Sequence, residues 1–303
     1  MPARSLDRAK RPSEWSLDQQ PVALSAEQKF QAEGFSAVDR ALSVIEILGD
    51  LPEGLTLSDL AKRLDVNKAI AHRLVATLEV RNYVFRHELS GRLHLTYKVS
   101  NLGLRRLAQN CLLDQSSVIL RGLADATGEL ARLAVVEGNR ITWVAAATGM
   151  ARALQVDASY SLRIALHAHA AGKAWLATLP FDQALSLLVA TGLPALTPQT
   201  LTRVEDIRAD LETIATRGYA ISFEEHSIGV GAVAVPVSVR QVTGQSSCVG
   251  TISLAAPTAR LGRADLEGLS ALLSVAAGRL AERWPLEQRE VAAVLSPRVE
   301  GSA

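Results

Sequence analysis

Histidine and carboxylate side chains form two short groups that could bind a metal or act in acid–base catalysis. His167 and His169 are two residues apart, and Glu224, Glu225 and His226 are consecutive. Imidazole and carboxylate groups suit zinc, and the same groups can move protons in hydrolysis. No further ligand has a diagnostic spacing. We therefore expect no metal, and keep a metal site or a small hydrolase using His167, His169 and Glu225 as the alternative.

Other motifs of cofactor binding and catalysis do not occur in the sequence. Gly229-x-Gly231 is followed by a β-type run and not by a helix, which excludes a dinucleotide fingerprint. Gly172-Lys173 lacks the rest of a phosphate-binding loop, and there is no GxSxG elbow. The two cysteines are far apart, which excludes a disulfide scaffold and a cysteine zinc cluster. We expect neither an enzyme nor a cofactor.

Basic side chains concentrate in one part of the chain. The 303 residues have a net charge of +1, but residues 61–106 contain ten Lys and Arg against three Asp and Glu, a difference of +7. Such a local charge in a near-neutral protein is typical of a face that binds a polyanion. The alternative is an ordinary solvated helix surface.

Length and composition indicate a globular chain of two domains, with 48% hydrophobic and 21% charged residues. The N-terminal segment has no apolar core of a secretory signal, and no apolar run is long enough for a membrane span. These features predict a cytoplasmic protein without a membrane partner.

Three helices and a hairpin must position the basic residues. Apolar residues recur with helical spacing over residues 37–48, 57–64 and 68–80, and two alternating runs then meet at Ser90-Gly91. This order predicts a winged helix-turn-helix. Four apolar residues of the first helix share the face that we expect to meet the core: Val38, Leu42, Ile45 and Leu48.

The second part of the chain has a mixed pattern. Residues 97–127 are predicted as two helical pieces, strands and helices then follow without regular alternation, and a last helix is expected over residues 263–283. An α+β domain around an antiparallel sheet fits this order.

Four segments resemble the IclR family of bacterial transcription regulators. LTLSDLAKRLDVNKAIAHRLVATLEVRNYV is similar to its winged helix-turn-helix, and ALHAHAAGKAWLA resembles the family segment LHATALGKALLA. RGYAISFEEHSIGVGAVAVPV and TISLAAPTARL resemble later hallmarks of the family. The resemblance implies dimers or dimers of dimers. It also implies a winged helix-turn-helix (36–97), a linker and dimerisation helix (98–115) and a GAF-like effector domain (116–285). Residues 1–35 mix Pro, Ser, Gln and charged residues without periodicity and are predicted to be a flexible tail, and residues 286–303 are predicted to be a C-terminal tail.

A recognition helix places its first turn and one polar face in the major groove of DNA. This assigns DNA contacts to the predicted recognition helix, the two helices before it and the wing: Arg40, Thr56, Ser58, Asn67, Lys68, Ala69, His72, Arg73, Arg86 and Arg92. Ala69-Ile70 stands where family members commonly have Ser-Thr, which alters the expected base preference. Ile70 is equally expected as a core residue.

The resemblance also implies an effector site between the sheet and the segment before a helix. The residues expected there are Trp143, Leu154, Ala170, Ala171, Ser222, Ala232, Ser253 and Ala255, with Met150 as a further wall. Alanines at two positions that are polar in glyoxylate-type members imply a larger and more apolar pocket. A small carboxylate with a larger, for example aromatic, body is therefore expected. The alternative is that Ser222 and Ser253 only satisfy strand-end hydrogen bonds.

Together these features predict a transcription regulator of a catabolic operon, with repression as the favoured direction. Its expected partners are double-stranded operator DNA, a small carboxylate and further copies of the chain. The alternative regulator is a DNA-binding protein whose second domain only oligomerises.

Overall fold

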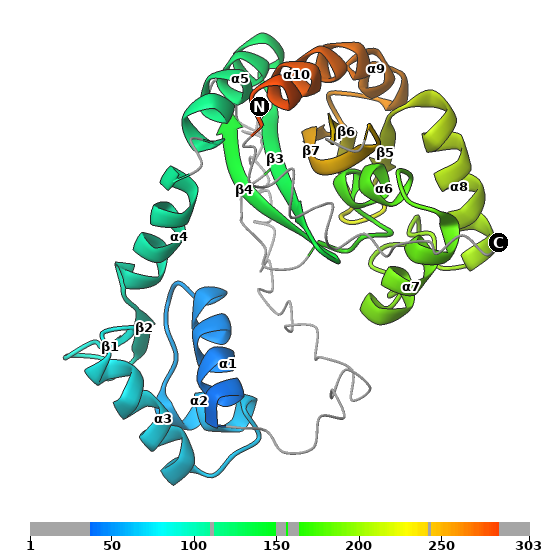
Figure 1. Ribbon diagram of the computed structural model, residues 1–303. Helices are drawn as coiled ribbons and strands as arrows, with labels where there is room; N and C mark the ends of the chain where they lie inside the picture. The colour runs from blue at the N-terminus through cyan, green and yellow to red at the C-terminus, as the bar shows by residue number, and fades with distance from the viewer. Residues whose placement is uncertain (1–36, 110–111, 150–155, 157–163, 242–243, 285–303) are drawn as a thin grey trace, which may run out of the picture.

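The computed structural model describes residues 37–109, 112–149, 156, 164–241 and 244–284, which form two domains joined by helix α4 (Figure 1). The first domain consists of α1 (Ala37–Gly49), α2 (Leu57–Arg63), α3 (Lys68–Val80) and the antiparallel strands β1 (Val84–Arg86) and β2 (Leu93–Leu95). Its core contains Val44, Leu60, Val75, Leu78 and Leu93. This arrangement is the winged helix-turn-helix expected from the sequence.

Side chains at the helix ends explain why the helices begin and end where they do. The Thr56 hydroxyl oxygen accepts a hydrogen bond from the Asp59 amide at 3.2 Å, which makes Thr56 the N-cap of α2. The Asn67 side chain accepts from the Ile70 amide at 2.9 Å and caps α3. Asn82 has a φ of 58°, so it supplies the expected left-handed residue after α3.

The buried face of α1 differs from the predicted one. Val44 and Leu48 are buried, whereas Val38 and Leu42 are 68% and 55% exposed. The helix is apolar on two sides, and only the side that meets the rest of the domain is covered within one chain. Placing Val38 and Leu42 in the core was therefore wrong, because periodicity shows that a helix has apolar stripes and not which one is covered.

The second domain is an α+β unit around a five-stranded antiparallel sheet. Helices α4 (Tyr97–Gln109) and α5 (Leu112–Thr127) lead into β3 (Leu130–Glu137) and β4 (Arg140–Thr148). The remaining elements are α6 (Ala170–Leu176), α7 (Phe181–Thr191), α8 (Val204–Arg217), β5 (Ala220–Phe223), β6 (Val230–Arg240), β7 (Ser246–Pro257), α9 (Arg263–Gly268) and α10 (Ser270–Glu282). The strand order is β4-β3-β7-β6-β5.

Helices cover both faces of this sheet (Figure 1). Alternate residues of the strands pack on α5 and α10 in one cluster and on α6, α7 and α8 in another. The boundary predicted between the linker helix (98–115) and the effector domain (116–285) falls inside α5. This helix packs against β3, β4 and α10. No helix within the described ranges is long and apolar enough to cross a membrane.

The last helix is two helices and not the single one expected over residues 263–283. The break lies at Leu269, directly after Gly268, and the Ser270 hydroxyl donates to the Glu267 carbonyl at 2.6 Å. Glycine is a poor helix former, and a hydroxyl bonded to a nearby carbonyl competes with the backbone ladder. The apolar side chains Leu266 and Leu273 are still both fully buried.

Candidate functional site

The start of α3 presents a polar, exposed surface. Lys68, Ala69, His72 and Arg73 are all exposed on it. Asn67 is exposed too, but its side-chain oxygen already caps the helix. Ile70 is half-buried, so it belongs neither fully to the core nor to this surface. Two cations and an imidazole on the first two turns of α3 can form hydrogen bonds with base edges in the major groove of DNA.

The other predicted DNA contacts differ in how far they are engaged inside the protein. Ser58 is exposed, and Thr56 and Arg40 are half-buried. Arg92 donates to the Gly54 carbonyl at 2.7 Å. Arg86 lies 3.6 Å from a Glu79 carboxylate oxygen. The two wing arginines therefore help to hold the wing in place. A DNA phosphate would have to compete for them with the Gly54 carbonyl and the Glu79 carboxylate.

A cavity of about 510 Å³ opens on the α6 face of the sheet, and we call it the sheet cavity. Seven of the eight residues predicted for an effector site line it: Trp143, Ala170, Ala171, Ser222, Ala232, Ser253 and Ala255. Their strands are neighbours, since β5 pairs with β6, β6 with β7 and β7 with β3. Leu154 and Met150 lie outside the described residues. The structure thus brings the predicted set together, while its role in binding stays a prediction.

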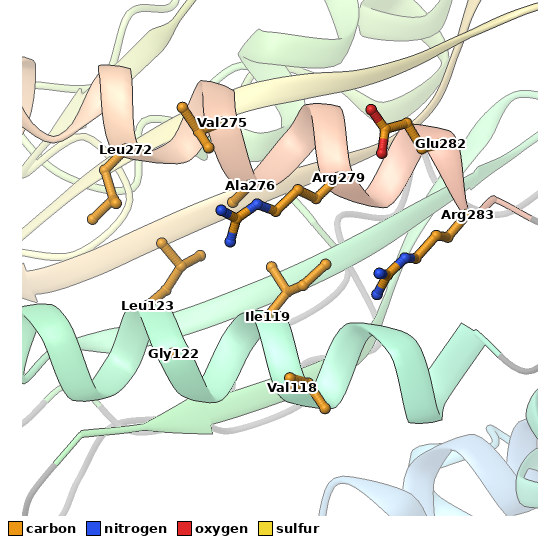
Figure 2. Close-up of a pocket in the computed structure, with 10 residues that line it drawn as sticks. All are labelled: Val118, Ile119, Gly122, Leu123, Leu272, Val275, Ala276, Arg279, Glu282 and Arg283. Atoms are coloured by element: carbon orange, nitrogen blue, oxygen red, sulfur yellow. The ribbon is translucent and has the colours of Figure 1, made fainter.

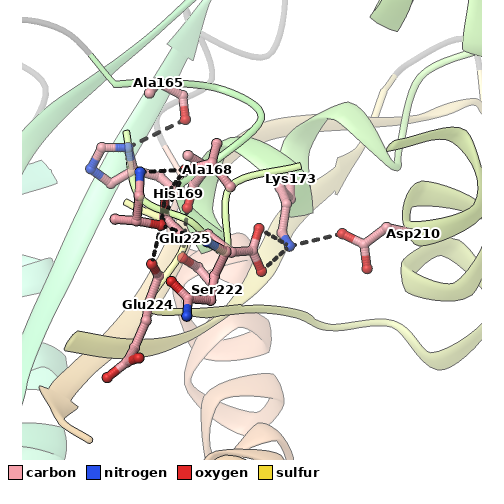
Figure 3. A network of polar contacts seen from close by, with 11 residues as sticks. Ala165, Ala168, His169, Lys173, Asp210, Ser222, Glu224 and Glu225 are labelled. Atoms are coloured by element: carbon pink, nitrogen blue, oxygen red, sulfur yellow. Dashed lines mark hydrogen bonds and ion pairs between the residues drawn. The ribbon is translucent and has the colours of Figure 1, made fainter. Parts of the chain in front are cut away.

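The two serines of the sheet cavity have different surroundings. The Ser222 hydroxyl donates to the Ala168 carbonyl at 2.6 Å, which ties β5 to the segment before α6 (Figure 3). Ser253 is buried and stands opposite Arg132 in the β3–β7 pairing. The alternative role, in which a serine only satisfies a strand-end hydrogen bond, therefore fits Ser222. Ser253 is the serine better suited to a ligand.

Among the cavity-wall residues that sequence reasoning did not predict, three carry a cationic or imidazole side chain: Arg132, His169 and His226. The Arg132 guanidinium carbon lies 5.1 Å from the centroid of the Trp143 ring, within cation–π range. The signal was present, because Arg132 is a charged residue in the middle of an otherwise apolar stretch of the predicted strand LARLAVVE, whose other charged residue, Glu137, is at its end.

The two histidine rings, of His169 and His226, lie against each other in a tilted arrangement at the cavity wall. Their centroids are 3.7 Å apart and the ring planes are inclined by 39°. Burial, followed by the proximity of His226, lowers the pKa of His169 to about 3, so this ring is neutral at pH 7. Burial, followed by the Arg132 charge, also lowers the pKa of His226 below its ordinary value.

A buried ion-pair network holds α6 in place beside the cavity (Figure 3). The Lys173 side chain is only 3% exposed, and its Nζ lies 2.8 Å from an oxygen of Glu225 and 2.8 Å from an oxygen of Asp210. Burial raises the pKa of Glu225, and the Lys173 charge opposes this rise. The network joins α6, α8 and the segment after β5.

The same contacts weaken the hydrolase and metal alternatives. Lys173 binds both carboxylate oxygens of Glu225, and His167 Nε2 lies 3.0 Å from the Pro194 carbonyl. Neither Glu225 nor His167 lines the sheet cavity. Within the described part of the chain, no three His, Cys, Asp or Glu side chains come together as a metal site would require.

A second cavity of about 510 Å³ lies between α5 and α10, and Figure 2 shows side chains from both helices along it. Its walls are mainly apolar, including Val118, Ile119, Leu272 and Val275, with Arg279, Glu282 and Arg283 at one end. We call this second cavity the helix cavity. No strand contributes to it, and none of the predicted effector residues lines it.

Two family models match the chain, and together they cover both domains. "IclR helix-turn-helix domain" matches residues 37–88, and "Bacterial transcriptional regulator IclR C-terminal" matches residues 105–281. The chain belongs to the IclR family. This IclR-family chain is a DNA-binding transcription regulator, and the predicted fold class and family are confirmed.

Curated relatives of this IclR regulator are regulators themselves. It is 27% identical to the HTH-type transcriptional repressor AllR of Escherichia coli (strain K12) over 228 residues, which cover 75% of this chain and 82% of AllR. It is 30% identical to the HTH-type transcriptional regulator BhcR of Paracoccus denitrificans over 248 residues, which cover 82% of this chain and 86% of BhcR.

Solved structures of IclR regulators have the same fold. The one from Alicyclobacillus acidocaldarius has a TM-score of 0.71 and 26% identity, covering 82% of this chain and 98% of that chain. An IclR homologue from Microbacterium hydrocarbonoxydans, complexed with 4-hydroxybenzoate, has a TM-score of 0.66 and 22% identity, covering 83% and 99%. The likeness to the second shows the fold alone.

Proposed function

We propose that this regulator binds operator DNA as a homodimer or a dimer of dimers, in the cytoplasm, and represses a catabolic operon. A small carboxylate with an apolar body, bound in the sheet cavity, controls its binding to DNA. The convergence on one cavity of seven residues expected from the family resemblance is the observation that supports this function best.

The size and lining of the sheet cavity support this ligand class. About 510 Å³ is within the range of small-molecule sites and has room for an aromatic acid. Trp143, Ala232 and Ala255 offer apolar contact, while Arg132 and Ser253 offer hydrogen-bond donors. The 4-hydroxybenzoate bound by the Microbacterium homologue is an aromatic carboxylate of this kind. The repressor AllR supports repression as the direction of control.

Contacts at both ends of α4 supply a path from the cavity to the DNA-binding domain. Lys98 on α4 donates to the Arg81 carbonyl at 2.7 Å and lies 4.4 Å from the centroid of the Tyr83 ring. Arg106 on α4 pairs with Glu137 of β3 at 4.0 Å. Because β3 also carries Arg132, a ligand that favours one position of β3 can bias α4, provided that it binds the two states with different affinity.

A thermal-shift screen of the purified protein against aliphatic and aromatic carboxylates tests the ligand class. A ligand at 100 times its dissociation constant adds about 2.7 kcal/mol to the free energy of unfolding. We expect stabilisation by at least one carboxylate, which Ser253→Leu abolishes by filling the cavity, whereas Val275→Leu at the helix cavity keeps it. No stabilisation by any carboxylate would favour a second domain that only oligomerises.

A further inference from the structure

The histidine pair of the sheet cavity, His169 and His226, has no role in the DNA surface or in the buried ion-pair network. His169 precedes α6 and His226 lies between β5 and β6, so 57 residues separate them in the chain, by the difference of their numbers. The fold brings their ring centroids to 3.7 Å, and both rings line the cavity. Two imidazoles in a ligand cavity suggest a part in ligand recognition.

Each ring has one nitrogen engaged with the protein. His169 Nδ1 lies 3.3 Å from the Ala165 carbonyl oxygen, which suits an Nδ1–H donor (Figure 3). His226 Nδ1 lies 2.8 Å from the Ser227 hydroxyl oxygen. These contacts leave Nε2 of each ring as the nitrogen suited to a ligand.

The charged groups around the pair are mainly basic. Arg132 on β3 and His167 act on both rings, and each makes protonation of the histidines less favourable. Lys173 on α6 has its charge balanced by Glu225 and Asp210.

One further acid lies in the turn that carries His226, and it too is engaged with the protein. A carboxylate oxygen of Glu224 accepts from the Gly229 amide at 3.0 Å and from the Thr258 hydroxyl at 2.8 Å. Because the Glu224 carboxylate is already bonded to the protein, an anion entering the cavity would meet mainly Arg132 and the two imidazoles.

We propose that His226 is the proton-accepting residue of the effector site, so that an effector carboxylate binds together with one proton. The inference rests on the proposed function, because it assumes an acidic ligand in the sheet cavity. The proton comes from solvent and adds to the neutral imidazole of His226. The resulting imidazolium pairs with the ligand carboxylate, and no covalent bond to carbon forms or breaks.

The surroundings select His226 and not His169 for this role. His226 is the more exposed of the two at the cavity, so a proton reaches it from solvent more readily than it reaches His169. His169 is held neutral by burial, with a pKa of about 3. Its ring then offers a neutral aromatic face to a charged His226, which is a cation–π arrangement.

The sign of the pH dependence follows from the two states of His226. Without ligand its pKa is below the ordinary histidine value, and a bound carboxylate raises it, because an opposite charge favours the protonated form. Affinity is therefore highest below the pKa of the free protein and falls as the pH rises through the pKa of the complex.

Isothermal titration calorimetry on the full chain tests the proposal with benzoate, 4-hydroxybenzoate and glyoxylate at pH 6 and pH 8. We expect the carboxylates that bind to do so about tenfold more weakly at pH 8, and to take up a fraction of a proton at pH 7 when phosphate and Tris buffers are compared. His226→Gln should bind at pH 6 as weakly as the unmodified protein does at pH 8. His226→Arg should bind with nearly the same affinity at both pH values.

A control variant and two outcomes separate this proposal from the proposed function. His87→Gln, in the wing, should keep the full pH dependence. Equal affinity at both pH values, or an unchanged pH dependence in His226→Gln, would overturn the role of His226 and leave the carboxylate effector standing. If none of the three carboxylates binds at either pH, both the ligand class and the proton-coupled site are refuted.

Discussion

Lys68 and Arg73 project from the first two turns of α3, and both are exposed. A contact with a guanine edge contributes about 1–3 kcal/mol to the binding free energy. A contact with a phosphate changes the slope of log affinity against log salt concentration by about one unit. We predict that Lys68→Ala with Arg73→Ala lowers the affinity for specific DNA at least about tenfold. The measurement is fluorescence anisotropy on a fragment selected from random-sequence DNA, over a range of salt concentrations.

Arg81 provides a matched control for this double variant. It is an exposed arginine in the same domain, but it follows the other end of α3. Arg81→Ala should change affinity far less. Specific binding that survives the loss of both Lys68 and Arg73 would mean that another surface reads the DNA.

Loss of Lys173 should strongly destabilise the second domain. Lys173→Met leaves the carboxylates of Glu225 and Asp210 without their cation, and breaking a buried pair in this way costs about 3–5 kcal/mol. Without Lys173 the pKa of Glu225 rises further, so the folded state binds a proton more readily than the unfolded state does. The loss of stability should then be smaller at pH 5 than at pH 8, as measured by urea unfolding.

The double variant Lys173→Met with Glu225→Leu is the control for this interpretation. It removes the stranded carboxylate of Glu225 and should recover part of the stability. A Lys173→Met protein with unchanged unfolding at pH 8 would show that the network is not needed to hold α6.

Helix α6 depends on a close approach of two backbones at Gly172. A Cβ atom on Gly172 would lie 2.5 Å from the Leu166 carbonyl oxygen, and a backbone atom cannot move aside as a side chain does. Gly172→Ala should therefore shift the segment that carries Ala168, Ala170 and Ala171. We predict a loss of about 1–3 kcal/mol in unfolding free energy, together with weaker carboxylate binding.

A second helical glycine distinguishes crowding from a general effect of alanine. Gly278 in α10 has open space around its Cα, so Gly278→Ala should stabilise the protein by about 0.5–1 kcal/mol. Chemical unfolding of the two variants side by side makes the comparison. Equal effects of the two substitutions would contradict the close approach at Gly172.

The assembly of the whole molecule is predicted from apolar side chains that one chain leaves uncovered. Val38 and Leu42 on α1, and Leu102 and Leu104 on α4, are exposed. Exposed apolar side chains that gather on a surface mark association sites. We predict that Leu42→Lys with Leu104→Lys shifts the protein toward a smaller assembly in light scattering and weakens binding to a two-half-site operator.

Val275 supplies the contrasting variant. It is 57% exposed, but it lies on α10 beside the helix cavity. Val275→Lys should leave the dimer of DNA-binding domains intact. If Val275→Lys dissociates the protein and the α1–α4 variant does not, the chains associate through α5 and α10 instead.

Most elements of the fold could be predicted from local sequence, because their signals act over a few residues. Thr56, Asn67 and Asn82 mark helix ends by their own hydrogen bonds or backbone angle. The bounds of α3 are the predicted ones. The break at Gly268 was missed, because amphipathic spacing continues across it.

Contacts between distant segments could not be predicted in the same way. Apolar periodicity could not show that Val38 and Leu42 would be exposed, because the packing of the other elements decides which apolar stripe of a helix is buried. The resemblance to the family located seven residues of the sheet cavity, but not Arg132 or His226 as wall residues.

The sequence by itself determined the family, the order of the domains and the basic surface of α3, because these depend on residue types at short spacing. Only the tertiary structure decided that Lys173 meets Glu225 and Asp210, and that the His169 ring lies against the His226 ring. Those partners lie between 37 and 57 residues apart in the chain, by the differences of their numbers. Their meeting, and the pKa shifts that follow from it, depends on how the sheet and helices pack.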